Sequence, residues 1–376
     1  MFKGAHLTLL IGKVIARPAP KIVMDAVTDI QVTNSKQRSG FQISFSTGKT
    51  ALLTEAMLPA GYFDPIVTRV IIVVTLNGFP NVLMDGLITN QEYGPSNDAG
   101  QSTFTITGED LTLAMDLIEL TVPYPGMPII GIVNSIIARY VVLGIVPVVI
   151  PPFIPNFKNP TEGYDIQEGT DRAYIQELAE RVGFVFFHQA GPLPGQSIAY
   201  FGPDVNLPIP QSALSVNFDA HSNVESMSFS LDGLAKKIKV FTIFDPVTKK
   251  IPIPIPVPNI NAFKPPMGIR LTPPAKVSFS KDAAPMNPAE AGEAILGFMM
   301  KGSNSTSVTA TGSLDVARYG KILRARMMVG VRGASLAYDG MYYVDSVTHS
   351  IKKGEYKQSF SLSRDGLISN TPLVRP

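Results

Sequence analysis

The chain has no cysteine and no tryptophan among its 376 residues, and it has few charges. The lack of cysteine excludes disulfide scaffolds, thiolate zinc sites, iron–sulfur clusters and cysteine nucleophiles. Charged residues make up 16% of the chain, against about 25% in an average soluble domain. The 32 basic and 30 acidic residues nearly cancel, which argues against a general nucleic-acid binder. So few charges beside 45% hydrophobic residues indicate that much of the surface does not face water.

Neither a signal peptide nor a stable membrane span is expected. The apolar run Leu7–Ile11 is too short for a signal peptide and lacks a cleavage site, so we predict a strand. Gly126–Ile154 is apolar enough for a span, but Arg139 lies in its middle and prolines interrupt its second half. An arginine at mid-bilayer costs about 2.5–3.5 kcal/mol. We therefore predict a buried helix over Ile129–Tyr140 and a strand over Val146–Ile150, with a membrane anchor as the alternative.

Strand patterns dominate the rest of the chain. Apolar residues alternate with polar ones, or form short β-branched runs, between turn signals. Asn77-Gly78 predicts a hairpin, because both central positions of such a turn need a positive φ, which asparagine and glycine adopt readily. Asp85-Gly86 is expected to interrupt the strand that returns from this hairpin. The predicted strands are Phe41–Phe45, Arg69–Leu76, Ser102–Thr107, Phe184–His188, Ala213–Phe218, Val224–Leu231, Ile322–Val331, Tyr342–Ile351 and Tyr356–Arg364.

Three short helices are also predicted. The first begins near Gly108 and holds two carboxylates in its first turn, where they favour the positive end of the helix dipole. The second is capped by Thr170 and ends at Gly183. The third starts at Asn287, where an N-cap is followed by proline and a capping glutamate, and runs to about Lys301. Its apolar residues indicate either a core helix or a partner-binding face over 283–300.

The segment Ile251–Pro274 is rich in proline and begins with the run IPIPIPVP. Proline cannot donate a hydrogen bond to a strand ladder, so this segment is predicted to be polyproline-like or an uncovered sheet edge. We expect a loop or insertion that reaches out of a domain, and its role stays open.

The two β-rich ends of the chain repeat three features in the same order. Near the N-terminus VVTLNG is followed by LMDG (Leu83–Gly86) and then FTIT (Phe104–Thr107). Near the C-terminus VGVRG is followed by AYDG (Ala337–Gly340) and then FSLS (Phe360–Ser363). Either a β-barrel domain is duplicated, or two unrelated antiparallel meanders share common turn signals. If the duplication is real, a trimer presents six similar units and joins threefold to sixfold symmetry.

No catalytic, cofactor or metal constellation is evident, and an enzyme is not predicted. Gly48-Lys49-Thr50 has the end of a phosphate-binding loop but lacks its leading glycine and its helix. The clustered carboxylates Glu109, Asp110 and Asp116 are expected to form a solvated helix face, although a hydrolase needs only two carboxylates. The four histidines are scattered without ligand spacing: His6, His188, His221 and His349.

Several segments resemble one protein family. Tyr338–Leu367 (YDGMYYVDSVTHSIKKGEYKQSFSLSRDGL) resembles the closing signature of the late-control-D proteins, the central hubs of contractile phage tails and related injection systems. Gly169–His188 is similar to the helix–strand unit that this family shares with the hub half of the VgrG spike of type VI secretion. Leu214–Phe229 and Val82–Tyr93 also fit, and the resemblance spans about Asp29–Leu367.

The resemblance implies a β-rich trimer beneath the tail tube, with two barrels per subunit in a pseudo-sixfold ring. Such a ring adapts the sixfold inner tube to a threefold spike. The implied partners are two further copies, a spike protein, a tube or tube-initiator protein and baseplate wedge proteins. The family's oligonucleotide-fold domain and β-helix are missing, so the spike is expected to be a separate chain. Neither nucleic acid nor a stable membrane insertion is expected.

The predicted fold class is therefore α+β and β-rich, with two similar antiparallel β-barrel domains and mixed α/β insertions. The expected domains are a first barrel over 1–120, a mixed unit over 121–205, and a second barrel over 206–245 and 305–376. A proline-rich insertion with one helix fills 246–304. The expected function is a structural baseplate hub of a phage tail or phage-tail-like particle, assembled in the bacterial cytoplasm without a signal peptide. The alternative is a tail-associated cell-wall hydrolase.

Overall fold

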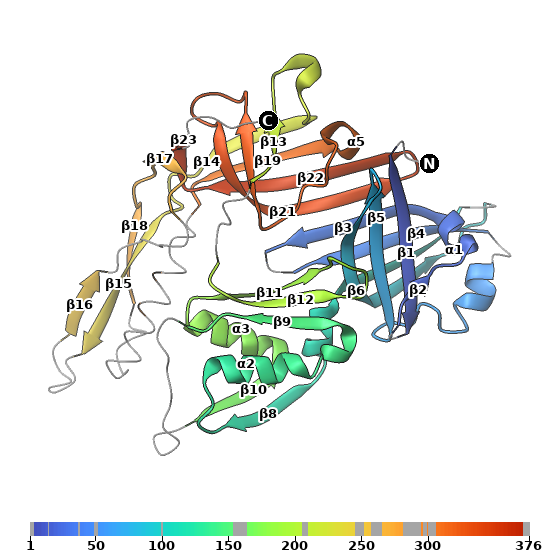
Figure 1. Ribbon diagram of the computed structural model, residues 1–376, viewed down its shortest axis with the longest axis horizontal. Coiled ribbons are helices and arrows are strands. Elements are labelled where there is room, and N and C mark those ends of the chain that lie inside the picture. The colour runs from blue at the N-terminus through green and yellow to red at the C-terminus, as the bar shows by residue number, and fades with distance from the viewer. Residues whose placement is uncertain are drawn as a thin grey trace.

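A large sheet, antiparallel except for the pair β13 and β20, forms the centre of the molecule (Figure 1). The computed structural model describes residues 4–13, 15–36, 38–48, 52–98, 101–152, 164–204, 210–244, 252–256, 265–280, 295, 299 and 306–370. The sheet has thirteen strands, and its main path runs β14-β19-β22-β21-β3-β4-β7-β6-β5-β1-β2, with β20 and β13 branching from β21.

The strands of this sheet come from two groups that are far apart in the sequence. The N-terminal group is β1 (Ala5–Lys13), β2 (Arg17–Pro18), β3 (Val27–Ser35), β4 (Gly40–Thr47), β5 (Thr68–Leu76), β6 (Phe79–Gly94) and β7 (Ser102–Asp110). The C-terminal group is β13 (Pro210–Ser215), β14 (Ser226–Leu231), β19 (Val308–Asp315), β20 (Met328–Arg332), β21 (Gly340–Lys352) and β22 (Glu355–Arg364).

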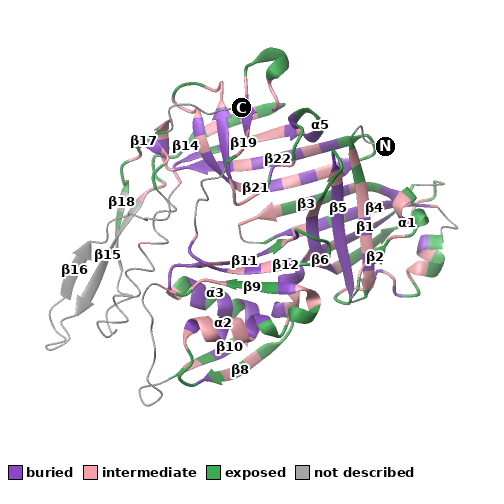
Figure 2. Ribbon diagram, viewed as in Figure 1, coloured by how far each residue is buried: buried purple, intermediate pink, exposed green. Residues whose placement is uncertain are grey.

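The alternation of apolar residues explains how the sheet builds its core. Phe41, Ile43 and Phe45 on β4 are all buried, and β4 pairs with β7 so that Phe45 lies opposite Phe104. The two rings stack with centroids 5.8 Å apart. Strand β5, a continuous and mostly β-branched run, is buried on both faces (Figure 2). Asn77 and Gly78 have φ values of 50° and 84°, which confirms the predicted turn between β5 and β6.

The two groups have the same strand order, as a duplication requires. The N-terminal group runs β3-β4-β7-β6-β5 and the C-terminal group runs β14-β19-β22-β21-β20. Both β6 and β21 carry a register shift against the following strand. The correspondence ends at the next strand, because β1 is antiparallel to β5 whereas β13 is parallel to β20.

A continuous seam joins the groups within one chain. Strand β21 pairs antiparallel with β3 over Ser346–Lys352, which places red and blue ribbons side by side in Figure 1. One hydrophobic core contains residues of both groups, among them Ile30, Val32, Val347 and Ile351.

The Asp-Gly pair of the N-terminal group does not interrupt its strand. Asp85 and Gly86 lie inside β6, so the prediction of a break there is wrong. Asp85 forms a buried ion pair with Arg69. A Cβ at Gly86 meets the backbone oxygen of Glu109 at 2.1 Å, so glycine permits the close approach of β7.

A mixed α/β unit with its own core lies beside the N-terminal group. It contains β8 (Glu119–Tyr124) paired with β10 (Asp165–Thr170), and the sheet β11-β12-β9 of Val185–Ala190, Ser197–Gly202 and Ile145–Val149. Its helices are α2 (Ile129–Ala138) and α3 (Asp171–Arg181). The predicted buried helix and the strand after it are therefore confirmed. No helix among the described residues is long and apolar enough to cross a membrane.

A three-stranded sheet extends away from the main sheet (Figure 1). Its order is β16 (Pro252–Pro256), β15 (Lys237–Phe244) and β18 (Lys276–Ser280). The proline run thus forms an edge strand, as one of the two predicted alternatives states. Nearby, β17 (Gly268–Leu271) pairs with β23 (Gly366–Ser369). The predicted helix over Asn287–Lys301 lies outside the described residues except for Ile295 and Met299, which are helical.

The remaining elements are short, and two further predictions need correction. They are α1 (Lys21–Ala26), η1 (Leu53–Met57), η2 (Leu111–Asp116), η3 (Val141–Leu143), η4 (Asp219–His221) and α5 (Val316–Tyr319). The first predicted helix starts at Leu111, because β7 continues through Asp110. The strand predicted from Ile322 starts only at Met328, because the side chain of Gln358 takes both backbone hydrogen bonds of Leu323.

Candidate functional site

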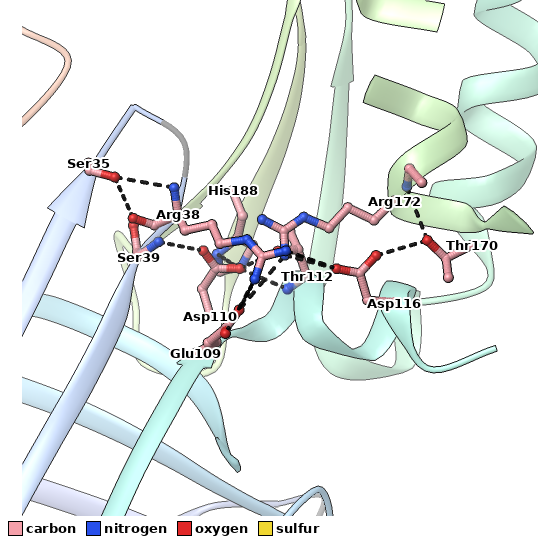
Figure 3. Close-up of polar contacts among 11 residues, drawn as sticks. Ser35, Arg38, Ser39, Glu109, Asp110, Thr112, Asp116, Thr170, Arg172 and His188 are labelled. Atoms are coloured by element: carbon pink, nitrogen blue, oxygen red, sulfur yellow. Dashed lines mark hydrogen bonds and ion pairs between the residues drawn. The ribbon is translucent and has the colours of Figure 1, made fainter. Parts of the chain in front are cut away.

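The acidic cluster singled out in the sequence lies where β7 and η2 meet the α/β unit (Figure 3). Arg38 Nη1 lies 3.4 Å from Glu109 Oε2, and Arg172 Nη1 lies 3.2 Å from Asp116 Oδ2. Thr170, the N-cap of α3, donates its hydroxyl to Asp116 Oδ1 at 2.9 Å. The expected solvated helix face is therefore wrong. These carboxylates instead connect the β3–β4 connection, the end of β7 and the start of α3.

Asp110, the third member of the cluster, serves as a cap. It is 6% exposed and accepts a hydrogen bond from the backbone nitrogen of Thr112 at 2.9 Å, which fixes the start of η2. It also accepts the backbone N–H of Ser39 at 3.3 Å and the hydroxyl of Thr112 at 2.5 Å. A carboxylate with this many donors is held in one orientation. Its geometry is that of a structural anchor.

His188 on β11 faces this anchor from the α/β unit (Figure 3). Its Nδ1 lies 4.0 Å from Asp110 Oδ1, and its Nε2 is buried without a hydrogen-bond partner in the described part of the chain. Burial lowers the pKa of His188 more than the neighbouring Asp110 and Asp85 raise it, while Arg326 and Arg69 lower it further. The imidazole is therefore neutral at physiological pH.

A small hollow lies where both strand groups and the α/β unit meet. Its volume of about 60 Å³ has room for a few water molecules, far below the roughly 300–1,000 Å³ of small-molecule sites. It is lined by Asn34, Ser39, Val82, Leu83, Met84, Asp110, His188, Gln189, Ala190, Ile322, Leu323, Arg324, Ala325, Arg326 and His349. The hollow lies at the junction of three parts of the fold, and its volume is too small for a substrate.

The scattered histidines and the Gly48-Lys49-Thr50 motif, which the sequence does not predict to be a site, do not come together as a single site among the described residues. His6 and His221 are exposed and lie on β1 and η4, and His349 lies on β21. Lys49 and Thr50 lie outside the described residues. Within the described part of the chain, no group of three histidine, aspartate or glutamate side chains is placed to hold a metal ion.

Sequence reasoning missed a buried polar cluster at the start of α3. Asp171 is 1% exposed and accepts hydrogen bonds from Arg139 Nη1 at 2.9 Å, Tyr140 Oη at 2.8 Å and Gln167 Nε2 at 2.7 Å. Arg139 is the charge that argued against a membrane span, and its buried partner now explains it. Sequence spacing does not predict this contact, because Arg139 follows the end of α2 and Asp171 begins α3, 32 residues further along the chain.

His349 gives the molecule an acid-sensitive group inside the seam between β21 and β3. Its Nδ1 lies 2.8 Å from Tyr356 Oη and 3.3 Å from Gln358 Nε2, both of which donate to an unprotonated nitrogen. Burial, with a smaller contribution from the positive charge of Arg324, lowers the pKa of His349 to about 3. The folded chain therefore keeps this ring neutral in mild acid.

We expect His349 to make the free energy of unfolding fall as the pH drops from about 6.5 to about 3. In that range His349 is protonated in the unfolded chain and neutral in the folded chain. The free energy of unfolding therefore falls by about 1.4 kcal/mol for each pH unit. His349→Gln removes this contribution, so urea unfolding between pH 7 and 4 should show a shallower loss of stability. His221→Gln, at an exposed position, is the control and should keep the full slope. Equal slopes in all three proteins would contradict the assignment.

Two open strand edges remain on the surface. Beyond Ile88, the segment Asn90–Gly94 of β6 pairs only with β7 among the described residues, and β14 pairs only with β19. Large apolar side chains are exposed at both places, with Tyr93 46%, Leu231 43% and Leu234 62% exposed. Open edges with exposed apolar residues are typical of association sites, because unpaired backbone groups accept another strand. The arrangement suits protein assembly.

Solved structures of two phage tail proteins share the fold of this chain over nearly its whole length. No family model and no curated protein matches the chain. Among solved structures, the tail protein from Neisseria meningitidis MC58 is 14% identical with a TM-score of 0.62, covering 97% of this chain and 98% of that one. The 43 kDa tail protein of prophage MuSo2 from Shewanella oneidensis is 14% identical with a TM-score of 0.60, covering 96% and 99%.

A third solved structure comes from a secretion system. It is the E. coli c3393 protein, described as a component of the type VI secretion system with structural similarity to the T4 bacteriophage tail proteins gp27 and gp5. It is 10% identical with a TM-score of 0.53, covering 93% of this chain and 77% of that one. At such identities the likeness establishes the fold. The predicted resemblance to tail and injection-system proteins is thus confirmed at that level.

Proposed function

We propose that the chain is the structural hub of a contractile tail or injection machine, where it adapts a sixfold inner tube to a threefold spike. The observation that carries the proposal is the end-to-end fold correspondence with two phage tail proteins. The duplicated strand order supports the adaptor role, because three copies of a chain with two similar groups present six similar units.

The proposal assigns a part to each region of the chain. Residues 1–120 form one barrel, and 206–245 with 305–376 form the other, while 121–205 is the mixed unit and 246–304 the projecting insertion. Its partners are two further copies, a separate spike protein, a tube or tube-initiator protein and baseplate wedge proteins. It acts as a scaffold without chemistry of its own, inside a particle assembled in the bacterial cytoplasm. The arginine partners of Glu109 and Asp116 support a structural use of these carboxylates.

Reconstitution with the tube and spike proteins of the same particle tests the function. The purified chain should form a complex with each protein alone and a ternary complex with both, because tube and spike bind opposite faces of a hub. Failure to bind either protein would contradict the proposal. So would cleavage of peptidoglycan in a zymogram that Glu109→Gln abolishes.

A further inference from the structure

The hollow between the two strand groups and the α/β unit has more hydrogen-bond donors on its walls than the described residues satisfy. It lies where residues 322–326, which precede β20, meet His188 on β11 and His349 on β21. Arg324 and Gln189 are exposed members of its lining, so small solutes can reach it from the solvent. Three side chains of this lining carry nitrogens without a partner in the described part of the chain.

The first of these nitrogens belongs to His349, whose tautomer follows from its neighbours. The backbone N–H of Leu323 donates to Gln358 Oε1 at 3.0 Å, and Gln358 Nε2 donates to the backbone oxygen of Leu323 at 2.8 Å, which fixes the orientation of the amide. The amide NH2 group and the hydroxyl of Tyr356 both reach His349 Nδ1, which therefore accepts. A neutral imidazole must then carry its hydrogen on Nε2, and this N–H has no acceptor among the described residues.

The other two nitrogens are Arg326 Nε and His188 Nε2, which are both buried without a partner within the described ranges. Arg326 donates from Nη2 to the backbone oxygen of Ser35, and its guanidinium lies 4.4 Å from the ring centroid of Phe187. These contacts fix the guanidinium while its Nε–H stays unused. Buried polar groups are nearly always hydrogen-bonded, so a wall with such donors indicates a bound acceptor.

The charges on the lining do not balance. Its charged side chains are Arg324, Arg326 and Asp110, two positive charges against one negative. Burial lowers the pKa of His188 and of His349, so both rings are neutral at pH 7. Neither arginine forms an ion pair among the described residues, since one donates to an amide oxygen and the other to a backbone oxygen. Asp110 already accepts three hydrogen bonds. One monovalent anion would neutralise the remaining positive charge.

We propose that the hollow binds a small monovalent anion, of the size of chloride or formate, which accepts a hydrogen bond from Arg326 Nε. His349 Nε2 is a further donor on the same wall, and His188 is another in the tautomer that carries its hydrogen on Nε2. The volume of about 60 Å³ admits such an ion but not a sugar acid as large as gluconate. Because the walls come from both strand groups and the α/β unit, the ion stabilises the junction of the single chain, whatever its partners in a particle.

Chloride titration of the purified full-length chain tests the site. Urea unfolding is measured at pH 7 and constant ionic strength while chloride replaces gluconate. An anion that binds only the folded chain stabilises it by mass action. Above the dissociation constant, each tenfold rise in chloride should therefore lower the unfolding equilibrium constant about tenfold. Formate should act in the same way. An unfolding constant that does not change between gluconate and chloride would contradict the site.

A pair of variants separates a bound ion from a general salt effect. Arg326→Met removes the charge and the Nε–H, so it should abolish the chloride dependence. Arg318→Gln is the matched control, because Arg318 is exposed on α5 and lies outside the lining, and it should keep the full dependence. Equal chloride dependence in the native chain and in Arg326→Met would overturn the proposal.

Bromide locates the ion in the native chain, so the test stands even where Arg326→Met fails to fold. Crystals grown in bromide should show an anomalous peak within hydrogen-bond distance of Arg326 Nε, alongside the chloride dependence in solution. Water alone in the hollow would overturn the proposal. A bromide peak without any effect of chloride in solution would mark an adventitious ion only, and it would overturn the proposal as well.

Discussion

Asp85→Leu is expected to lower the free energy of unfolding by about 3–5 kcal/mol, the usual cost of leaving one member of a buried ion pair alone. Asp85 and Arg69 form two parallel contacts of 2.7 Å, and their side chains are 0% and 7% exposed. Arg69 also donates to the backbone oxygen of Gly195 at 3.3 Å, so it ties the α/β unit to β5. Urea unfolding at pH 7 measures the loss.

A double variant distinguishes an unpaired charge from lost packing. Arg69→Met/Asp85→Leu removes both charges together and should recover most of the stability, because an apolar pair of similar volume often matches a buried ion pair. The exposed pair Lys13–Asp64 is the matched control. Its side chains are 54% and 44% exposed, so Asp64→Ala should cost less than about 1 kcal/mol. A double variant as unstable as Asp85→Leu would contradict the charge argument.

Arg364→Met is expected to cost about 3 kcal/mol, because three carbonyl oxygens, one in a buried contact and two in part-buried contacts, lose their donor. Arg364 is 0% exposed and donates to the backbone oxygens of Gly366, Asp339 and Ala337 at 2.7–2.8 Å. Its guanidinium also lies 4.5 Å from the ring centroid of Tyr342. Loss of this residue should therefore loosen the connection that precedes β21.

A conservative variant checks the geometry of this contact. Arg364→Lys keeps the charge, but a single ammonium lacks the planar fork that reaches three separate carbonyls. It should fall between the native protein and Arg364→Met in urea midpoint. Limited proteolysis near Ala337 should accelerate in the same order. Native-like stability of Arg364→Met would show that water satisfies the three carbonyls, and it would remove the assigned role.

Much of the fold follows from local sequence patterns. Alternation predicts β4 and β22, Asn77-Gly78 predicts its hairpin, and Thr170 predicts the start of α3. The repeated motifs leave open a duplicated domain or two unrelated meanders, and the common strand order of the two groups favours the duplication. The strand predicted from Ile322 begins only at Met328, because the side chain of Gln358 takes the backbone hydrogen bonds that a neighbouring strand would make with Leu323. The periodicity of the sequence does not reveal such a side-chain contact.

The polar contacts were much less accessible from sequence. Glu109, Asp110 and Asp116 are close in the sequence, yet their partners come from the β3–β4 connection and from α3. The two Asp-Gly motifs look alike, but Asp85 pairs with an arginine while Asp339 accepts the backbone N–H of Ala334 at 2.8 Å. Long-range pairing decides each role. The spacing of residues in the sequence can identify candidate carboxylates, but it cannot identify the distant residues that they contact.

Single-particle electron microscopy of the purified full-length chain tests the central claim most directly, because it reports symmetry and subunit shape together. The account predicts a closed ring with threefold symmetry and six similar lobes, two from each copy. A population of monomers, twofold particles or open chains of subunits would contradict it.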